Sequence, residues 1–199
     1  MNDVRIYDIL WRTPNSGPSP DNNLRTEIYF GGCKRAMAGN PCPNCFNPDL
    51  WDGSKCYPKN PKDIVREIIR HDVPRYITIV GGEPTDQMPG LEDLIKELKS
   101  NDFHVMLFTW HSMDWLKNNM RNEIRKICDI IVTEPYKADE RIYDTSKCDG
   151  VHEVIGSGNQ QVWIPQEDLY YLAGELTELV LDEKNRMKVI KNNGVCENY

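Results

Sequence analysis

The chain has 199 residues, enough for one domain with a hydrophobic core, and its 39% hydrophobic and 28% charged residues exclude a disordered protein. The 31 acidic and 24 basic residues give a formal net charge of −7, which argues against general binding of nucleic acids because that needs a basic surface. The N-terminus lacks the basic and apolar regions of a signal peptide, and no apolar run approaches the roughly 20 residues that cross a bilayer. We therefore expect a cytoplasmic protein that contacts neither membrane nor nucleic acid.

Strands and helices are predicted to alternate along the first two thirds of the chain, after a turn-rich loop at residues 13–23. Short apolar runs predict strands at residues 26–30, 76–80, 105–109 and 130–132. Capping residues and helical spacing predict helices that begin near Pro61, Leu91, Met113 and Ile124. This alternation is typical of a parallel sheet built from βαβ units.

The pattern weakens after Val132. Residues 166–191 carry apolar positions at partly helical spacing, which predicts a C-terminal helical extension, and residues 192–199 predict a frayed tail. We therefore divide the chain into an α/β domain at residues 1–165 and an extension at residues 166–199.

Three of the seven cysteines, Cys33, Cys42 and Cys45, lie close together in a loop that follows the first predicted strand. Three thiolates that reach one point bind a metal centre and leave one coordination position open, as in an iron–sulfur cluster. Structural zinc needs a fourth ligand, for which Cys56 or His71 is available. The cysteines alone leave zinc, an iron–sulfur cluster and a redox-active pair of Cys42 with Cys45 as alternatives. The other cysteines, including Cys128, Cys148 and Cys196, are expected to be structural or free thiols.

A glycine turn, Gly81-Gly82-Glu83-Pro84, follows the strongest predicted strand. Ligands of parallel sheets bind at the carboxyl ends of strands, and two glycines allow the backbone to approach a ligand closely. Glu83 is placed to accept hydrogen bonds from an amine. Most such turns have no function, but this one lies one βα unit beyond a loop with three cysteines. Together the two features favour an iron–sulfur cluster over zinc.

These features together resemble the radical S-adenosylmethionine (SAM) superfamily, and in particular the glycyl-radical activating enzymes such as the activase of anaerobic class III ribonucleotide reductase. The narrower resemblance rests on three further stretches: residues 42–51 (CPNCFNPDLW), 108–110 (FTW) and 156–160 (GSGNQ). It covers roughly residues 5–165. Eight residues separate Cys33 from Cys42 where the family has three, an insertion that a loop accommodates at little cost. The family's Asp-Gly is replaced by Glu134-Pro135.

The resemblance implies a partial (βα) barrel of parallel strands with outer helices. It implies a [4Fe–4S] cluster on Cys33, Cys42 and Cys45, with SAM bound to the open iron and split into methionine and a 5′-deoxyadenosyl radical. The radical is expected to abstract hydrogen from a glycine of anaerobic ribonucleotide reductase. The electron donor is expected to be of the flavodoxin or ferredoxin type.

The same resemblance assigns the remaining SAM contacts. Gly81, Gly82 and Glu83 are expected to hold the methionine amine, and Pro84 to shape the turn. Thr109 is assigned to the ribose or carboxylate, Phe46 to the adenine or the cluster, and Asn159 to the active site. Phe46 is equally well explained as a core aromatic, Thr109 as an ordinary strand end and Asn159 as part of a turn. Two other functions stay open: a radical SAM reaction on a small molecule or peptide, and a non-catalytic zinc-binding module.

Overall fold

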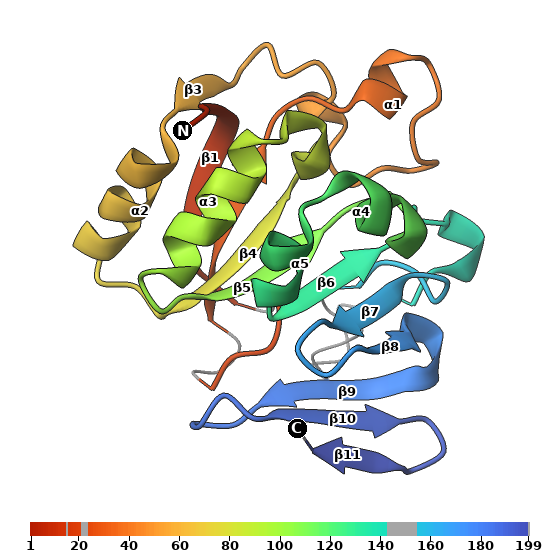
Figure 1. The fold of residues 1–199 in the computed structure, drawn as a ribbon. Helices are drawn as coiled ribbons and strands as arrows, with labels where there is room; N and C mark the ends of the chain where they lie inside the picture. The colour runs from red at the N-terminus through yellow and green to blue at the C-terminus, as the bar shows by residue number, and fades with distance from the viewer. Residues whose placement is uncertain (15, 21–23, 143–154, 199) are drawn as a thin grey trace.

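The computed structural model describes residues 1–14, 16–20, 24–142 and 155–198. Within these residues an eight-stranded sheet has the strand order β3-β1-β2-β4-β5-β6-β7-β8, and a three-stranded sheet has the order β11-β10-β9 (Figure 1). The strands of the large sheet are β1 (Val4–Thr13), β2 (Arg25–Phe30), β3 (Tyr57–Lys59), β4 (Tyr76–Gly81), β5 (His104–Phe108), β6 (Ile130–Thr133), β7 (Gln161–Ile164) and β8 (Leu169–Leu172). Those of the small sheet are β9 (Leu176–Leu181), β10 (Met187–Lys191) and β11 (Cys196–Asn198).

The centre of the large sheet is parallel, as the alternating pattern predicts. Strands β2, β4, β5 and β6 pair in parallel, with Phe30 opposite Gly81 and Ile79 opposite Leu107. The outer strands are antiparallel: β1 and β3 on one side, β7 and β8 on the other. The fold is therefore mixed α/β, and its parallel part is limited to the four central strands.

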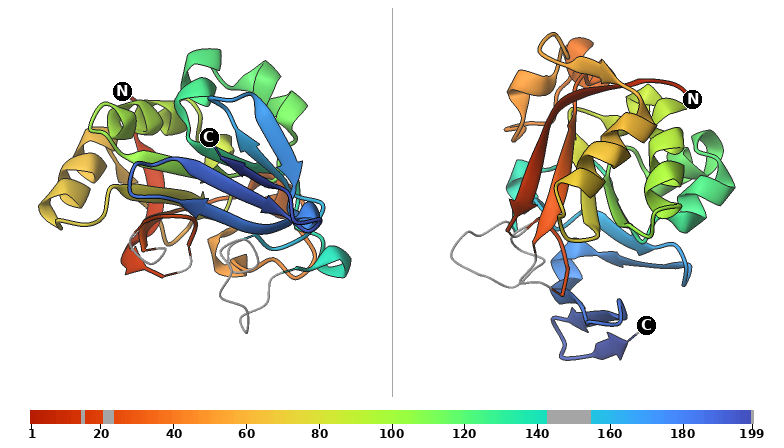
Figure 2. Two further views of the ribbon diagram at one scale, coloured as in Figure 1. Left: turned by 90° about the horizontal axis from the view of Figure 1, so that it is seen from below. Right: turned by 90° about the vertical axis from the view of Figure 1, so that its left-hand side faces the viewer.

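The longer helices cover one face of this sheet (Figure 2). The α-helices are α1 (Lys34–Met37), α2 (Pro61–Arg70), α3 (Gly90–Lys99), α4 (Met113–Asn119) and α5 (Asn122–Ile127). Short 3-10 helices span Pro48–Leu50, Pro84–Gln87, Ala138–Glu140 and Ala173–Glu175. The predicted starts are confirmed, since the side chain of Asn60 caps α2 and that of Ser112 caps α4. No helix in the described ranges is long and apolar enough to span a membrane.

Side chains on the central strands alternate between two environments. Ile28, Ile77 and Ile79 belong to the apolar core that the helices cover. Their neighbours Glu27 and Thr78 point to the opposite face and line a cavity. Because successive side chains of a strand point to opposite faces, the same strands supply both the apolar core and a partly polar cavity wall.

The predicted C-terminal helix is wrong: between residues 166 and 191 the chain forms β8, β9 and β10. Apolar residues three apart, such as Leu176 and Leu179, suggested a helix, but Leu179 and Leu181 alternate with less buried residues and pair across the hairpin with Val189 and Met187. Asp182 closes the turn because its carboxylate accepts from the Lys184 and Arg186 amides.

The predicted frayed tail is also wrong, since β11 pairs with β10. Strand β8 continues the large sheet past residue 165, and the division into two domains stays a prediction.

The long first strand, β1, was not predicted from the sequence. Its buried positions, Val4, Ile6 and Ile9, are interrupted by an irregularity in the pairing with β2, so they do not alternate evenly.

The turn-rich loop that follows β1 is anchored by Arg25, which is completely buried. The guanidinium of Arg25 donates to the carbonyls of Pro18 and Ile77 at 2.6 Å each and to Thr78 Oγ1 at 2.7 Å. Burial lowers the pKa of Arg25 to about 9.

Replacing Arg25 by Met should destabilise the protein, because two buried carbonyls then lose a charged donor. We expect the free energy of unfolding in urea to fall by about 3 kcal/mol. Arg66→Met is the matched control, because Arg66 is exposed on α2 and its one ion pair among the described residues is with Asp63, so the substitution should cost less than about 0.5 kcal/mol. Equal effects of the two substitutions would contradict this account.

Candidate functional site

The cysteine loop leaves β2 and closes back on its own start. The Gly32 amide donates to the Leu50 carbonyl at 2.7 Å, and the Cys33 amide donates to the Trp51 carbonyl at 2.8 Å. Within the loop, the Cys45 amide donates to the Cys42 carbonyl at 3.2 Å. The insertion after Cys33, residues 34–41, begins with the single helical turn α1 and continues as a turn closed by the Gly39 and Asn40 amides. The extra residues therefore form a compact turn while both ends of the loop stay fixed.

The glycine turn after β4 is bonded directly to the start of that loop. The Gly82 amide donates to the Phe30 carbonyl at 2.8 Å, and the Glu83 amide donates to the Gly32 carbonyl at 2.7 Å. A Cβ atom on Gly82 would lie 2.3 Å from the Gly32 carbonyl oxygen, which no side chain tolerates. Gly81 has a φ of 128°, a conformation that favours glycine. Both glycines are thus needed for the approach of two backbone segments.

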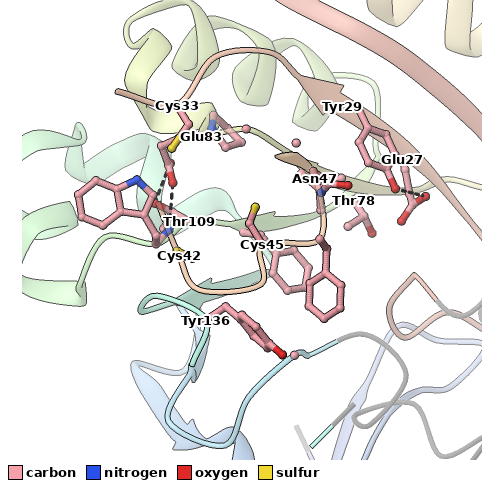
Figure 3. A pocket seen from close by; sticks show the side chains of 18 of the residues that line it. Glu27, Tyr29, Cys33, Cys42, Cys45, Asn47, Thr78, Glu83, Thr109 and Tyr136 are labelled. Carbon is pink, nitrogen blue, oxygen red and sulfur yellow. Dashed lines mark hydrogen bonds between the residues drawn. The ribbon is translucent and has the colours of Figure 1, made fainter. Parts of the chain in front are cut away.

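A cavity of about 530 Å³ lies between these segments and the sheet (Figure 3). Nine of the ten predicted site residues line it: Cys33, Cys42, Cys45, Phe46, Gly81, Gly82, Glu83, Pro84 and Thr109. The tenth, Asn159, is not on the wall. Its Nδ2 donates to the Pro135 carbonyl at 3.0 Å, between Glu134 and Tyr136, which do line the cavity.

The three cysteines share this cavity without meeting at one point. Among the described residues, no three His, Cys, Asp or Glu side chains lie close enough to hold a single metal ion. Cys33 is buried, and Cys42 and Cys45 are half-buried. Burial raises the pKa of Cys33 and of Cys42. Trp51 Nε1 donates to Cys45 Sγ at 3.4 Å, a contact of the kind that tunes a sulfur ligand.

Glu83 connects the ends of β4 and β5. One carboxylate oxygen accepts from the Thr85 amide at 3.0 Å, from Thr85 Oγ1 at 2.6 Å and from Thr109 Oγ1 at 2.8 Å. The other accepts from the Trp110 amide at 3.0 Å. The carboxyl is almost fully buried, and burial raises its pKa to about 7. Thr109 is therefore more than an ordinary strand end, because it helps to hold Glu83.

Several aromatic residues line the cavity, among them Phe46, Trp110 and Tyr136. Trp110 lines it and lies against His111, whose ring stacks in turn on Trp115 at a centroid distance of 3.5 Å. Burial lowers the pKa of His111 to about 4, so this ring is neutral at physiological pH. Phe46 is 55% exposed, and its ring lies 4.9 Å from that of Tyr136, so it is not a core aromatic.

The comparison with known families decides the kind of centre. A family described as a 4Fe-4S single cluster domain matches residues 22–163, more than half of the chain. The chain belongs to this family. The choice that the cysteines alone left open is settled for a [4Fe–4S] cluster, and three thiols on one cavity wall fit the thiolate ligands that such a cluster uses.

Relatives of this 4Fe-4S domain include two pyruvate formate-lyase-activating enzymes. The one from Staphylococcus epidermidis is 36% identical over 95 residues, which are 43% of this chain and 35% of the relative. The one from Staphylococcus aureus (strain USA300) is 40% identical over 93 residues, again 43% and 35%. The chain thus matches about a third of the length of these relatives. The resemblance to glycyl-radical activating enzymes is confirmed.

The other described thiols and the alternative fourth ligands lie off the cavity wall of the 4Fe-4S domain. Cys56 packs against the backbone of Gly31, and His71 stacks on Trp11 at a centroid distance of 4.0 Å. Cys128 is buried and Cys196 is exposed, while Cys148 lies outside the described residues. Four further wall residues were not predicted: Glu27, Tyr29, Glu134 and Tyr136. For Glu27 and Tyr29 the signal in the sequence was their alternation with buried residues along β2, which does not reveal that the other face of the strand lines a cavity.

Glu83→Gln should change how stability depends on pH. Glu83 has a folded pKa of about 7, above the value of 4.5 for the free group, so the folded state binds the extra proton. Its contribution to stability is full below pH 4.5 and is lost as the pH rises through 7. From about pH 5 to pH 7, the free energy of unfolding of the cluster-free wild type should fall relative to that of Glu83→Gln by on the order of 2 kcal/mol. A difference that does not change with pH would contradict a raised pKa.

Proposed function

We propose that this chain is a radical SAM enzyme of the glycyl-radical activating type, with its cluster on Cys33, Cys42 and Cys45. The observation that carries the proposal is that the glycine turn and all three cysteines line one cavity and are joined by backbone hydrogen bonds. The family match and the activating-enzyme relatives support it. The cofactors of this proposal are a [4Fe–4S] cluster and SAM.

When bound, the cluster supplies the electron that splits SAM into methionine and an organic radical. The protein's own contribution is to bind, orient and shield. Gly81, Gly82 and Pro84 shape a turn whose backbone lies on the cavity wall, where the amine of SAM would bind. Four hydrogen bonds hold the Glu83 carboxylate in place, so that its negative charge lies beside that turn. Trp51 holds Cys45 through the indole N–H.

Phe46 and Thr109 are proposed as further SAM contacts. The partly exposed Phe46 lines the cavity, and Thr109 follows the end of β5 and donates to Glu83. For Asn159 we propose an indirect role. Its side chain holds the carbonyl of Pro135 and thereby positions the wall residues Glu134 and Tyr136. The closure of the sheet as a partial barrel and a cytoplasmic location also belong to this proposal.

The proposed target is a glycine of a partner protein that carries a glycyl radical. The relatives are named for pyruvate formate-lyase, and no comparison supports the predicted anaerobic ribonucleotide reductase. Both are candidate targets, and a flavodoxin or ferredoxin is the proposed electron donor. The partner would need to insert its glycine loop into the cavity beside Phe46 and Tyr136.

The reconstituted protein, with SAM and a one-electron reductant, should produce a glycyl-radical EPR signal on one of the two candidate targets. Cys45→Ala should abolish the signal, because the cluster loses one of its three ligands. Cys196→Ala is the matched control, because Cys196 is exposed in β11 and outside the cavity, and it should leave the signal unchanged.

Absence of the signal with both targets, while SAM is still split, would contradict the activating role and favour a radical SAM reaction on a small molecule or peptide. A protein that retains zinc and no labile sulfide would contradict the radical chemistry itself.

A further inference from the structure

The ionisable groups on the described wall of the cavity have one sign of charge. Three carboxylates line it, those of Glu27, Glu83 and Glu134, and no Lys, Arg or His belongs to the described lining. A cleft lined by one sign of charge concentrates its field and selects among charged ligands. This arrangement therefore favours cationic or neutral ligands over phosphates and carboxylates.

Glu27 and Tyr29 lie at the end of the cavity away from the glycine turn. Figure 3 shows them with Thr78 on one side, and Cys33 and Glu83 on the other. Both come from β2, where their side chains point away from the helix-covered core. This end of the cavity thus belongs to the face of the sheet and lies apart from the loop motifs proposed to hold SAM.

The carboxylate of Glu27 keeps acceptor capacity for a ligand. Its Oε2 accepts a hydrogen bond from the Tyr29 hydroxyl at 3.1 Å, and the Thr13 side chain is a second donor to the carboxylate. No Lys or Arg among the described residues forms an ion pair with it. Arg25 is the nearest cation along the strand, but its guanidinium donates to Thr78, Pro18 and Ile77 and lies outside the cavity. Burial raises the pKa of Glu27 and outweighs the opposing effects of the Tyr29 and Thr13 hydrogen bonds and of the Arg25 charge.

Glu134 is another acidic residue of the cavity wall, and its backbone has an unfavourable conformation. It has a φ of 78°, a conformation that glycine adopts more easily, and its amide donates to the His111 carbonyl at 3.1 Å. The structure thus keeps a carboxylate on the cavity wall at a position where glycine would cost less.

We propose that Glu27 recognises a cationic group of the substrate, so that the segment entering this cavity carries a lysine, an arginine or a free amine beside the reacting carbon. This inference rests on the proposed function and names its substrate class: a positively charged peptide segment, as opposed to a phosphorylated or carboxylated small molecule. Tyr29 is a positioning residue that holds the Glu27 carboxylate from the side.

The proposal is tested with three pentapeptides that have glycine at the centre and blocked termini. They differ at one position, which is lysine, norleucine or glutamate. Binding to the reconstituted protein with SAM is measured by anaerobic calorimetry. The lysine peptide should bind about tenfold more tightly than the glutamate peptide, the ratio expected for one partly buried charge contact. Glu27→Gln should reduce this ratio to less than about twofold, because the amide oxygen still accepts from Tyr29 but carries no charge.

Glu183→Gln is the matched control, since Glu183 is exposed in the β9–β10 turn, and it should keep the full ratio. The proposal is overturned if the lysine peptide does not bind, if the three peptides bind equally, or if Glu27→Gln keeps the preference. A different result would contradict the proposed function: an EPR spectrum of the cluster that does not change when SAM is added. In that case the ratio of peptide affinities is still measured, on the cluster-loaded protein without SAM.

Discussion

The site depends on the contact between two backbone segments that follow neighbouring parallel strands. The register of β2 and β4 places Phe30 opposite Gly81, so the next residues of both strands leave the sheet side by side. Two hydrogen bonds then join Gly82 to Phe30 and Glu83 to Gly32. A side chain on Gly82 would collide with the partner backbone. Because of this contact, the cysteine loop and the glycine turn form one rigid wall, although some 50 residues lie between them in the sequence.

Burial of Glu83 extends that wall to a third strand. Its carboxylate takes donors from Thr85, Thr109 and Trp110, so the ends of β4 and β5 are fixed relative to each other. The cost of burying a charge is visible in its raised pKa. A cation in the cavity would offset that cost, so the structural contacts of Glu83 are compatible with the binding role proposed for it.

Much of the central fold and of the site could be predicted from the sequence. The apolar runs at β2, β4, β5 and β6 are short and mostly buried, and the caps at Asn60 and Ser112 have local signatures. The cysteine and glycine motifs were predicted from residue type and spacing, and the structure brings them to one cavity.

The parts that failed depend on tertiary contacts. The residues around Leu176 and Leu179 have the spacing of a helix, and pairing with β10 decides that they form a strand. The cavity-facing roles of Glu27 and Tyr29 follow from the face that the helices leave uncovered. The position of Asn159 behind the wall depends on a hydrogen bond to Pro135, 24 residues away, which no local pattern indicates.

The most direct test of this account is EPR spectroscopy of the anaerobically reconstituted, reduced protein with and without SAM. The account predicts a [4Fe–4S]⁺ signal whose shape changes when SAM is added, because three cysteines leave one iron open to it. A cluster signal that SAM does not alter would contradict an open iron in this cavity, and absence of any cluster would contradict the assignment of Cys33, Cys42 and Cys45.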